Sequence, residues 1–191
     1  MRLVRGAAAA AVAIAVLGGC SSGETANETL PEASPTATET SEAPAPLGPP
    51  DLPMPPEARE QTPAGAEAAL RYYLQLVSHQ AGISGQALRD LSRDCAFCDF
   101  IADRYDQDAS AGYSYTGGDL TIKGISPPAL SGDIAEFSFT VDQADIGITD
   151  SGGNLVDGRG QVAVTGMNAG AQMTWSSVAK IWFMNQLIIN A

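Results

Sequence analysis

Histidine and cysteine are scarce in this 191-residue chain, which has one histidine (His79) and three cysteines. That is too few for an ordinary structural zinc site within one chain, because such a site needs four ligands of these types. Basic residues are also few: ten lysines and arginines stand against 22 acids, a formal net charge of −12. A surface this acidic repels phosphate backbones, which excludes nucleic acid as a partner.

Catalytic and ligand-binding motifs are also missing. His79 has no serine or cysteine arrangement to serve as a base. Asp106–Ser110 begins like a calcium-binding loop, but Ala111 stands where that loop needs glycine and Gly117 where it needs glutamate. Gly158-Arg159-Gly160 lacks the rest of a phosphate-binding fingerprint. We expect no metal and no cofactor, and we interpret Asp106–Ser110 as part of a solvated loop between a helix and a strand.

The N-terminus carries the clearest signal of location. Arg2 and Arg5 precede an uncharged stretch, Gly6–Leu17, whose length as a helix is about 18 Å, short of a hydrocarbon core of about 30 Å. This pattern indicates a cleaved export signal rather than a membrane span. The signal ends in Leu17-Gly18-Gly19-Cys20, which resembles the lipobox of bacterial lipoproteins.

The lipobox resemblance implies cleavage between Gly19 and Cys20 and a diacylglyceryl thioether on Cys20, with fatty acyl chains such as palmitate. Two acyl chains are what stable anchoring requires. We therefore predict a signal peptide at residues 1–19 and a lipid-anchored protein on the extracytoplasmic face of the cell membrane. The alternative is an ordinary secretory signal that happens to end near a cysteine.

Residues 21–60 differ sharply in composition from the rest of the chain. They hold nine of the twelve prolines and eight acids against Arg59 alone, and they contain no aromatic residue. Such a segment buries too little apolar surface to offset the entropy of ordering. We predict a lipidated, disordered tether rich in Pro, Thr and Glu at residues 20–60, which as a flexible coil spans about 35 Å.

Residues 61–191 are expected to form a single α+β domain. Thr62 can cap a helix that begins at Pro63, and apolar residues then recur at helical spacing up to Gly82. Ser84 opens a short second helix. A third helix follows, and the apolar residues on one of its faces are Phe97, Phe100, Ile101 and Tyr105.

After Gly112 the apolar pattern changes to the alternation of β-strands, clearest over residues 135–142. Asp150–Asn154 is typical of a hairpin loop. Further strand residues are Leu120, Ile122, Val162, Val164, Met173, Trp175 and the run Ile181–Ile189. Helices followed by antiparallel strands predict N-terminal helices packed on a curved antiparallel sheet. This arrangement resembles the NTF2-like cone, a fold that hosts isomerases, dehydratases, transport factors and binding modules.

A second resemblance covers most of the domain. With the lipobox and the tether in front, the chain is similar to the uncharacterised actinobacterial lipoprotein family catalogued as domain of unknown function 6318. That resemblance implies a location and an architecture but no reaction. Its motifs here are Thr62-Pro63, Gly65-Ala66, Tyr72-Tyr73, Leu88-Arg89-Asp90-Leu91-Ser92, Cys95-Ala96-Phe97-Cys98 and Gly117-Gly118.

Cys95 and Cys98 form the one motif with chemistry of its own. After export, two thiols this close meet an oxidising environment and are expected to form a structural disulfide. A thioredoxin-type redox centre is the alternative, but that motif follows a strand, and Asp94 and Asp99 would raise a thiol pKa rather than lower it. A zinc half-site shared between two chains is a further alternative.

These features favour a binding or interaction module over an enzyme. The strand aspartates are expected to point outward, whereas an enzyme of the NTF2-like type (isomerase or hydratase), the alternative function, needs a buried Asp or Tyr as its acid or base. The net charge favours another envelope protein or a small neutral or cationic ligand as the partner. The aromatic residues that are candidates to line a pocket are Tyr72, Tyr73, Tyr105, Trp175 and Trp182.

Overall fold

The computed structural model describes residues 46–190. The predicted signal peptide, the cleavage site at Gly19 and Cys20 and most of the predicted tether lie outside the described residues. Within them, a short 3-10 helix and three α-helices precede the strands: η1 (Pro56–Arg59), α1 (Pro63–His79), α2 (Gln86–Asp90) and α3 (Ala96–Ser110). Among these residues, no helix is long and apolar enough to cross a membrane.

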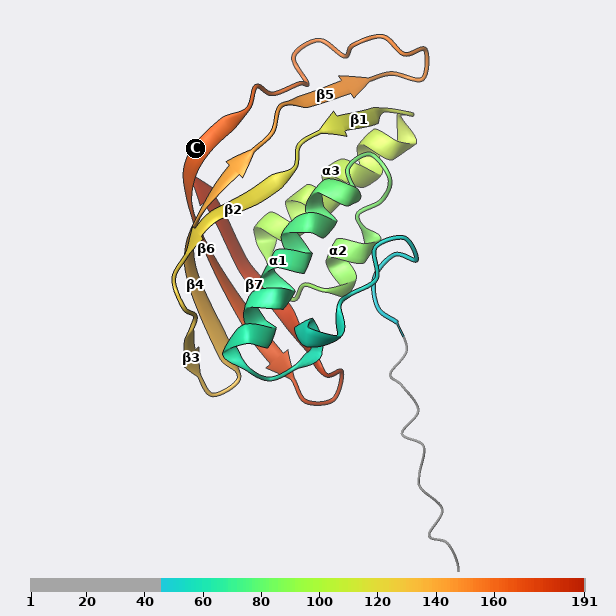
Figure 1. Ribbon diagram of the computed structural model, residues 1–191. Helices are drawn as coiled ribbons and strands as arrows, with labels where there is room; N and C mark the ends of the chain where they lie inside the picture. Colours follow the sequence, from blue (N-terminus) through green and yellow to red (C-terminus); the bar gives the residue numbers. More distant parts are fainter. Residues whose placement is uncertain (1–45, 191) are drawn as a thin grey trace, which may run out of the picture. The chain divides into compact units, whose positions relative to one another are not determined.

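The strands form one main antiparallel sheet in the order β2-β4-β6-β7, and β3 pairs with the other half of β4. A separate two-stranded ladder joins β1 and β5. The sheet is open rather than closed into a barrel, and the helices cover one of its faces (Figure 1). The strands are β1 (Ser114–Gly117), β2 (Leu120–Ile125), β3 (Ala129–Ser131), β4 (Ile134–Gln143), β5 (Ile146–Thr149), β6 (Val164–Ser176) and β7 (Ile181–Asn190).

Helix α1 begins where the sequence predicts. The Thr62 hydroxyl accepts a hydrogen bond from the Gly65 amide at 2.9 Å, and Pro63 occupies the first turn, where its missing N–H is harmless. The helix ends at His79, and the chain reverses three residues later at Gly82, whose φ of +71° suits glycine. The predicted apolar face of α1 is buried against the sheet.

The core lies between α1 and the inner faces of β4, β6 and β7. The predicted alternation in β4 is confirmed, because Phe137, Phe139 and Val141 are buried while the residues between them are more exposed. Trp175 of β6 and Trp182 of β7 are cross-strand partners whose ring centroids lie 5.4 Å apart. These two side chains fill the end of the core next to the turn between β6 and β7.

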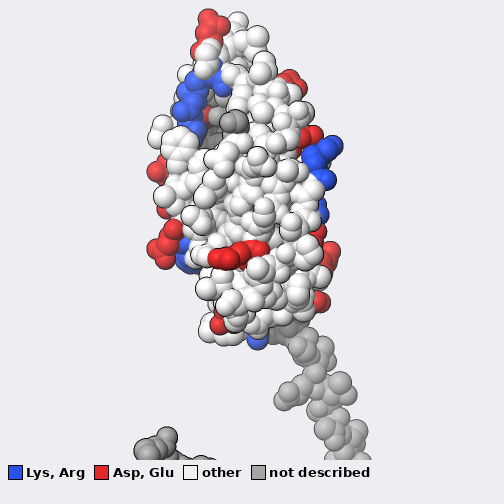
Figure 2. Space-filling model, turned by 90° about the vertical axis from the view of Figure 1, so that its left-hand side faces the viewer, with Lys and Arg blue, Asp and Glu red and all other residues white. Residues whose placement is uncertain are grey.

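The outer face of the sheet carries few charges at its centre, and most charged side chains lie toward its margins (Figure 2). Ser138 and Asn168 are exposed there, opposite the buried residues of their strands. Glu136 also lies on this face and accepts a hydrogen bond from the Gln172 side chain at 3.0 Å. The period-two pattern of the sequence thus sorts the two faces of the sheet correctly.

A sharp corner separates the β1–β5 ladder from the main sheet. Gly117, with φ of +71°, ends β1, and Gly118, with φ of +82°, begins the short connection to β2. Ala144 and Asp145 separate β4 from β5. The Gly118 amide donates to the Asp145 carbonyl at 2.9 Å. A Cβ on Gly117 would lie 2.1 Å from that same carbonyl oxygen, so the corner requires glycine. Strands β1 and β5 thereby run in a different direction from β2 and β4 (Figure 1).

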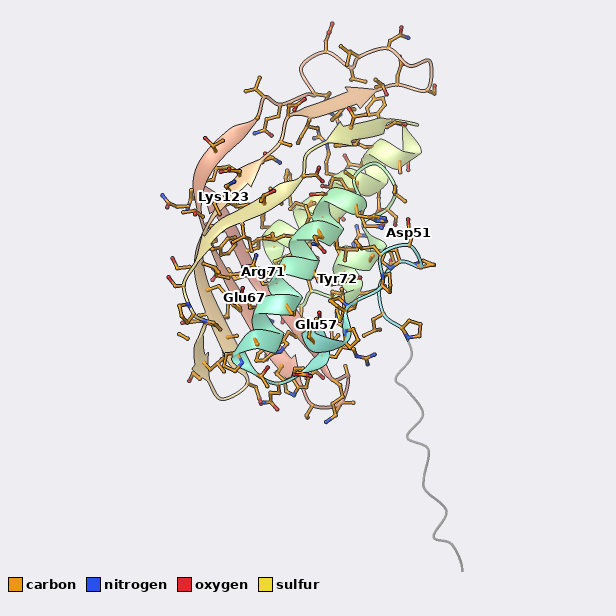
Figure 3. All side chains as sticks on the ribbon, in the orientation of Figure 1. Asp51, Glu57, Glu67, Arg71, Tyr72 and Lys123 are labelled. Atoms are coloured by element: carbon orange, nitrogen blue, oxygen red, sulfur yellow. A yellow bond between two sulfur atoms is a disulfide. The ribbon has the colours of Figure 1, made fainter. Side chains whose placement is uncertain are left out.

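The predicted boundary between tether and domain needs correction, because residues 47–60 pack onto the domain. Ala58 is fully buried, Met54 is 9% exposed, and Leu47 and Leu52 contact the core cluster. The Tyr72 hydroxyl donates to the Leu52 carbonyl at 2.8 Å, and Figure 3 shows Tyr72 near this segment. The few apolar residues among the prolines are the ones buried, so average composition gave a domain start that is too late.

Helix α3 and the segment before β6 also differ from expectation. Phe97 and Phe100 are 38% and 64% exposed and stack on each other with ring centroids 6.5 Å apart. The side of α3 that packs against the rest of the domain carries Cys98 and Ala102 instead. Val162 is 79% exposed and precedes β6 rather than belonging to it.

Candidate functional site

A cavity of about 420 Å³ lies between α3 and the strands, where the β1–β5 ladder meets the main sheet. Its size falls within the range of small-molecule sites. Most of its lining is apolar or aromatic, and its charged lining residues are two arginines. The residues that line it are Val77, Phe97, Phe100, Ile101, Arg104, Tyr105, Tyr115, Leu120, Gln143, Ile146, Ile148, Arg159, Gln161, Met167, Leu187 and Ile189.

One face of α3 forms one wall of this cavity. Phe97, Ile101, Arg104 and Tyr105 are spaced at i, i+4, i+7 and i+8, which places them on one side of a helix. The sequence therefore grouped three of these residues correctly on one face. That face is partly exposed because it borders a cavity rather than the filled core.

The bent strand β5 and the loop after it form the opposite wall. Asp150 closes a turn in which its carboxylate accepts from the amides of Gly152 and Asn154, each at 2.9 Å. The chain then returns along β5, where Ile146 and Gln161 exchange backbone hydrogen bonds of 2.7 and 3.0 Å. This return places Arg159 and Gln161 at the cavity. The predicted hairpin turn at residues 150–154 is thus part of the site's framework.

Asp108 lies beside the cavity and is 2% exposed. Its carboxylate accepts hydrogen bonds from the hydroxyl of Tyr115 and from the Arg159 guanidinium. Arg104, one helical turn earlier, donates to it from Nε at 3.2 Å. The guanidinium of Arg159 also lies 5.3 Å from the ring centre of Tyr113. A buried carboxylate thus holds two arginines and a tyrosine at one end of the cavity.

The contacts of Asp108 determine its charge. Burial by itself would raise its pKa, but the hydrogen bonds from Tyr115 and Arg159 and the charges of Arg159 and Arg104 outweigh burial and lower it. Burial and the bond to Asp108 raise the pKa of Tyr115. The carboxylate is therefore ionised and the phenol neutral at pH 7, so this pair has no group that titrates near neutrality.

Of the five aromatic residues predicted to line a pocket, Tyr105 lines this cavity, and burial raises its pKa. The structure corrects the prediction for Tyr72, Tyr73, Trp175 and Trp182, which belong to the hydrophobic core and are each at most 7% exposed. Their helical and strand spacing is that of core residues, because both elements turn these side chains toward the layer between helices and sheet.

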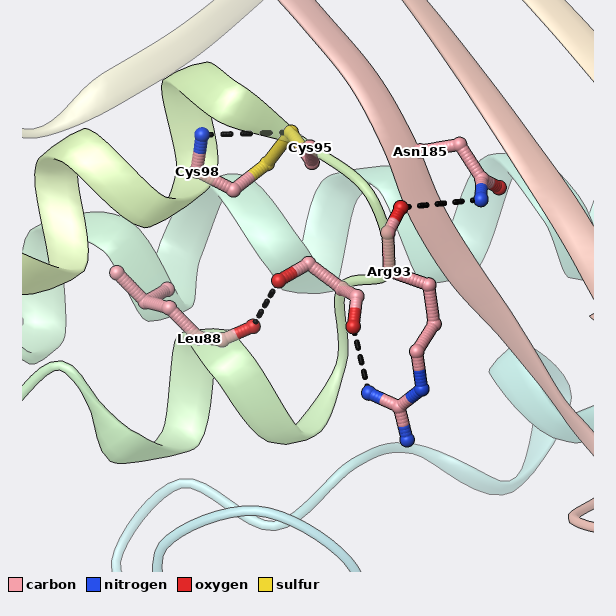
Figure 4. Close-up of a disulfide and its surroundings, with 6 residues drawn as sticks. Leu88, Arg93, Cys95, Cys98 and Asn185 are labelled. Carbon is pink, nitrogen blue, oxygen red and sulfur yellow. Dashed lines mark hydrogen bonds between the residues drawn. A yellow bond between two sulfur atoms is a disulfide. The ribbon is translucent and has the colours of Figure 1, made fainter.

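Cys95 and Cys98 form a disulfide at the start of α3 (Figure 4). Both are 1% exposed, and Cys95 Sγ caps the helix by accepting from the Cys98 amide at 3.3 Å. Nearby, the Asn185 side chain donates to the Arg93 carbonyl at 3.1 Å, which ties the turn to β7. Burial keeps these sulfurs away from exchange partners, which favours the structural role over the redox one.

His79, a further candidate from the sequence, has ordinary hydrogen-bond partners. His79 Nε2 lies 3.0 Å from a carboxylate oxygen of Asp51, and its other ring nitrogen lies 3.0 Å from the Gln80 side chain. In the part of the chain that the structure describes, no group of three or more His, Cys, Asp or Glu residues is placed to hold a metal ion.

Sequence reasoning missed Asp108, Arg104 and Arg159. The sequence pattern predicts a solvated loop at residues 106–110, but α3 continues to Ser110 and turns Asp108 inward. The available signal was local: Asp108 follows Arg104 by four residues and Tyr105 by three, which places all three on adjacent positions of one helix surface. Arg159 comes from a distant loop, and no local pattern marks it.

The helices and the open antiparallel sheet define an α+β domain with a cavity between its layers. No family model and no curated protein matches the chain.

Solved structures to which the chain is similar include the intermembrane space region of the chloroplast protein ARC6, with 17% identity, a TM-score of 0.49, and coverage of 69% of this chain and 98% of that one. A variant of the protein Rd1NTF2_05 has 7% identity, a TM-score of 0.40, and coverage of 65% and 96%. A conserved protein from Planctomyces limnophilus DSM 3776 has 14% identity, a TM-score of 0.40, and coverage of 65% and 98%.

Proposed function

We propose that this protein is a membrane-anchored extracytoplasmic lipoprotein that acts as a binding module, and that its ligand is a small molecule with an apolar body held between α3 and the sheet. The observation that carries this proposal is the cavity of about 420 Å³ with its largely apolar lining. Ligand sites combine such a lining with a few polar groups that fix orientation, as Arg104, Arg159 and Gln161 do here.

The position of the cavity supports an NTF2-like cone as the finer description of the fold. In such a cone, a bent sheet wraps around helices and leaves a space at its wide end. The corner at Gly117 and Gly118 turns the β1–β5 ladder, and β5 lines one side of the space next to α3. Membership of the actinobacterial lipoprotein family and the lipid on Cys20 belong to the same proposal and rest on the sequence motifs.

Binding of a neutral apolar fluorophore, N-phenyl-1-naphthylamine, tests the proposed function. The full chain in phosphatidylcholine nanodiscs is expected to bind the probe saturably above the signal of empty nanodiscs. Ile101→Trp, which fills the cavity from α3, is expected to weaken binding about tenfold. Val178→Trp is the matched control, because Val178 is 94% exposed in the turn between β6 and β7. Equal binding by both variants, or no saturable binding, would contradict the proposal.

A second function, an NTF2-like enzyme of the isomerase or hydratase type, is favoured by one observation. Asp108 is a buried carboxylate bonded to Tyr115, and Tyr115 lines the cavity. Against this, an acid–base catalyst at neutral pH needs a raised carboxylate pKa, whereas the pKa of Asp108 is lowered. Turnover of a ketosteroid or a small ester that Tyr115→Phe abolishes would establish the enzyme instead.

A further inference from the structure

The cavity has a local charge opposite to that of the whole chain. The chain has a formal net charge of −12, yet Arg104 and Arg159 are the charged residues of the cavity lining in the part of the chain described. Asp108 neutralises one of the two guanidinium charges through its contacts with both. One positive charge therefore remains in excess at this end of an otherwise apolar space.

Both guanidinium groups retain hydrogen-bond donors that Asp108 does not use. Arg104 donates to Asp108 through Nε, which leaves its two terminal nitrogens without a bond among the described residues. Arg159 uses Nη2 for Asp108, and its Nε is buried without a partner among the same residues. A buried N–H without a partner is costly unless a ligand or water satisfies it. These donors are the groups that bind carboxylates in fixed geometry.

We infer that the cavity binds an amphiphile with one carboxylate, whose apolar chain lies between α3 and the sheet and whose carboxylate contacts Arg104 and Arg159. The excess of one positive charge matches a monoanion rather than a phosphate dianion. Phe97, Phe100 and Ile101 line the α3 side that the apolar chain would contact. The net charge of the whole chain by itself favours a neutral or cationic ligand. The charge of the side chains that contact the ligand, here Arg104 and Arg159, decides the sign of the ligand's charge. The inference rests on the proposed binding function.

Three probes with the same eight-carbon chain test this inference: octanoate, 1-octanol and octyltrimethylammonium. Their dissociation constants are measured by ligand-observed NMR with the full chain in phosphatidylcholine nanodiscs, and empty nanodiscs correct for partition into lipid. Octanoate is expected to bind about tenfold more tightly than octanol, because charge-assisted hydrogen bonds add to a shared apolar contact. The cation is expected to bind most weakly.

Arginine variants locate the effect. Arg104→Gln is expected to weaken octanoate binding far more than octanol binding, and so to remove most of the preference for octanoate. Arg159→Gln is expected to do the same. The Arg104 side chain is 42% exposed, so Arg104→Gln is the variant expected to fold normally if Arg159→Gln does not. Arg71→Gln is the matched control, since Arg71 lies on α1, where it pairs with Glu67 at 2.7 Å and does not line this cavity (Figure 3).

The outcomes separate this inference from the proposed function. Saturable binding of none of the three probes would overturn both. Equal binding of octanoate and octanol, or tightest binding of the cation, would overturn the carboxylate inference and leave the binding function standing. A preference for octanoate that survives in both Arg104→Gln and Arg159→Gln would also overturn it.

Discussion

Asp108 keeps its charge in a nearly closed environment because donors from three parts of the chain surround its carboxylate. Arg104 comes from the same helix, Tyr115 from β1 and Arg159 from the loop after β5. A buried carboxylate without such partners would protonate or destabilise the fold. The same residue therefore fixes the end of α3, the position of β1 and the position of the long loop around the cavity.

Asp108→Asn is expected to lower the free energy of unfolding at pH 7 by about 3 kcal/mol, because it leaves two guanidinium groups without their counter-charge. The pKa of Asp108 is lowered in the folded state. Its stabilisation is therefore complete above the unfolded pKa of about 3.9 and is lost as the pH falls through the lower folded pKa. Urea unfolding from pH 7 to pH 3 should show the difference shrinking below about pH 4.

Asp103→Asn provides the control for that measurement. Asp103 also pairs with an arginine, Arg89, at 2.6 Å, but its side chain is 66% exposed. Its replacement is expected to cost less than about 1 kcal/mol, because solvent screens an exposed pair. Equal losses of unfolding free energy for Asp103→Asn and Asp108→Asn at pH 7 would show that burial of the Asp108 cluster adds nothing to the stability of the fold.

At the scale of the elements, local signals predicted what local interactions determine. The Thr62 cap and the Pro63 start predicted the beginning of α1, and alternation predicted the inner and outer residues of β4. The sequence did not show that Phe97 and Phe100 face a cavity. The apolar pattern of a helix face is the same whether that face packs against the filled core or borders a cavity. Arg159 joins the site through β5 pairing, which depends on residues far apart in the chain.

The contact between α2 and α3 is as specific as the strand corner. The backbone of Gly85 approaches α3 so closely that a Cβ there would lie 2.2 Å from the Ala102 carbonyl oxygen. Asp106 of α3 accepts from the Gly85 amide at 2.8 Å and from Arg89 at 2.7 Å. Both hydrogen bonds lower the pKa of Asp106, and the bond from the Gly85 amide has the larger effect. A glycine and an ion pair thus hold the short helix against the long one.

Gly85→Ala is expected to destabilise the domain by about 2 kcal/mol, because the added methyl group forces the two helices apart. Thermal or urea unfolding measures the loss. Gly170→Ala serves as the control, since a Cβ at that position would meet the Phe137 carbonyl oxygen at an ordinary 3.5 Å. A change below about 0.5 kcal/mol for Gly85→Ala would mean that the helices separate without cost.

At the scale of the whole molecule, the charge of the chain and the charge of its cavity serve different purposes. The acidic residues are spread over the chain and set its solubility and its repulsion from anionic surfaces. The two cavity arginines act over the few ångströms that matter for a bound ligand. An acidic protein with a cationic cavity can thus stay clear of anionic headgroups and still take up a single anionic amphiphile, provided that it is held near the membrane.

Cys20→Ala tests how the protein is held there. If Leu17-Gly18-Gly19-Cys20 is a lipobox, Cys20 carries the acyl chains, and each buried methylene contributes about 0.8 kcal/mol to anchoring. The variant is therefore expected either to appear in the soluble fraction or to remain unprocessed, as fractionation and mass spectrometry of the N-terminus would reveal. The paired variant Cys95→Ser with Cys98→Ser removes the disulfide and should stay in the membrane fraction. Membrane retention of Cys20→Ala with a trimmed N-terminus would contradict lipid attachment at this cysteine.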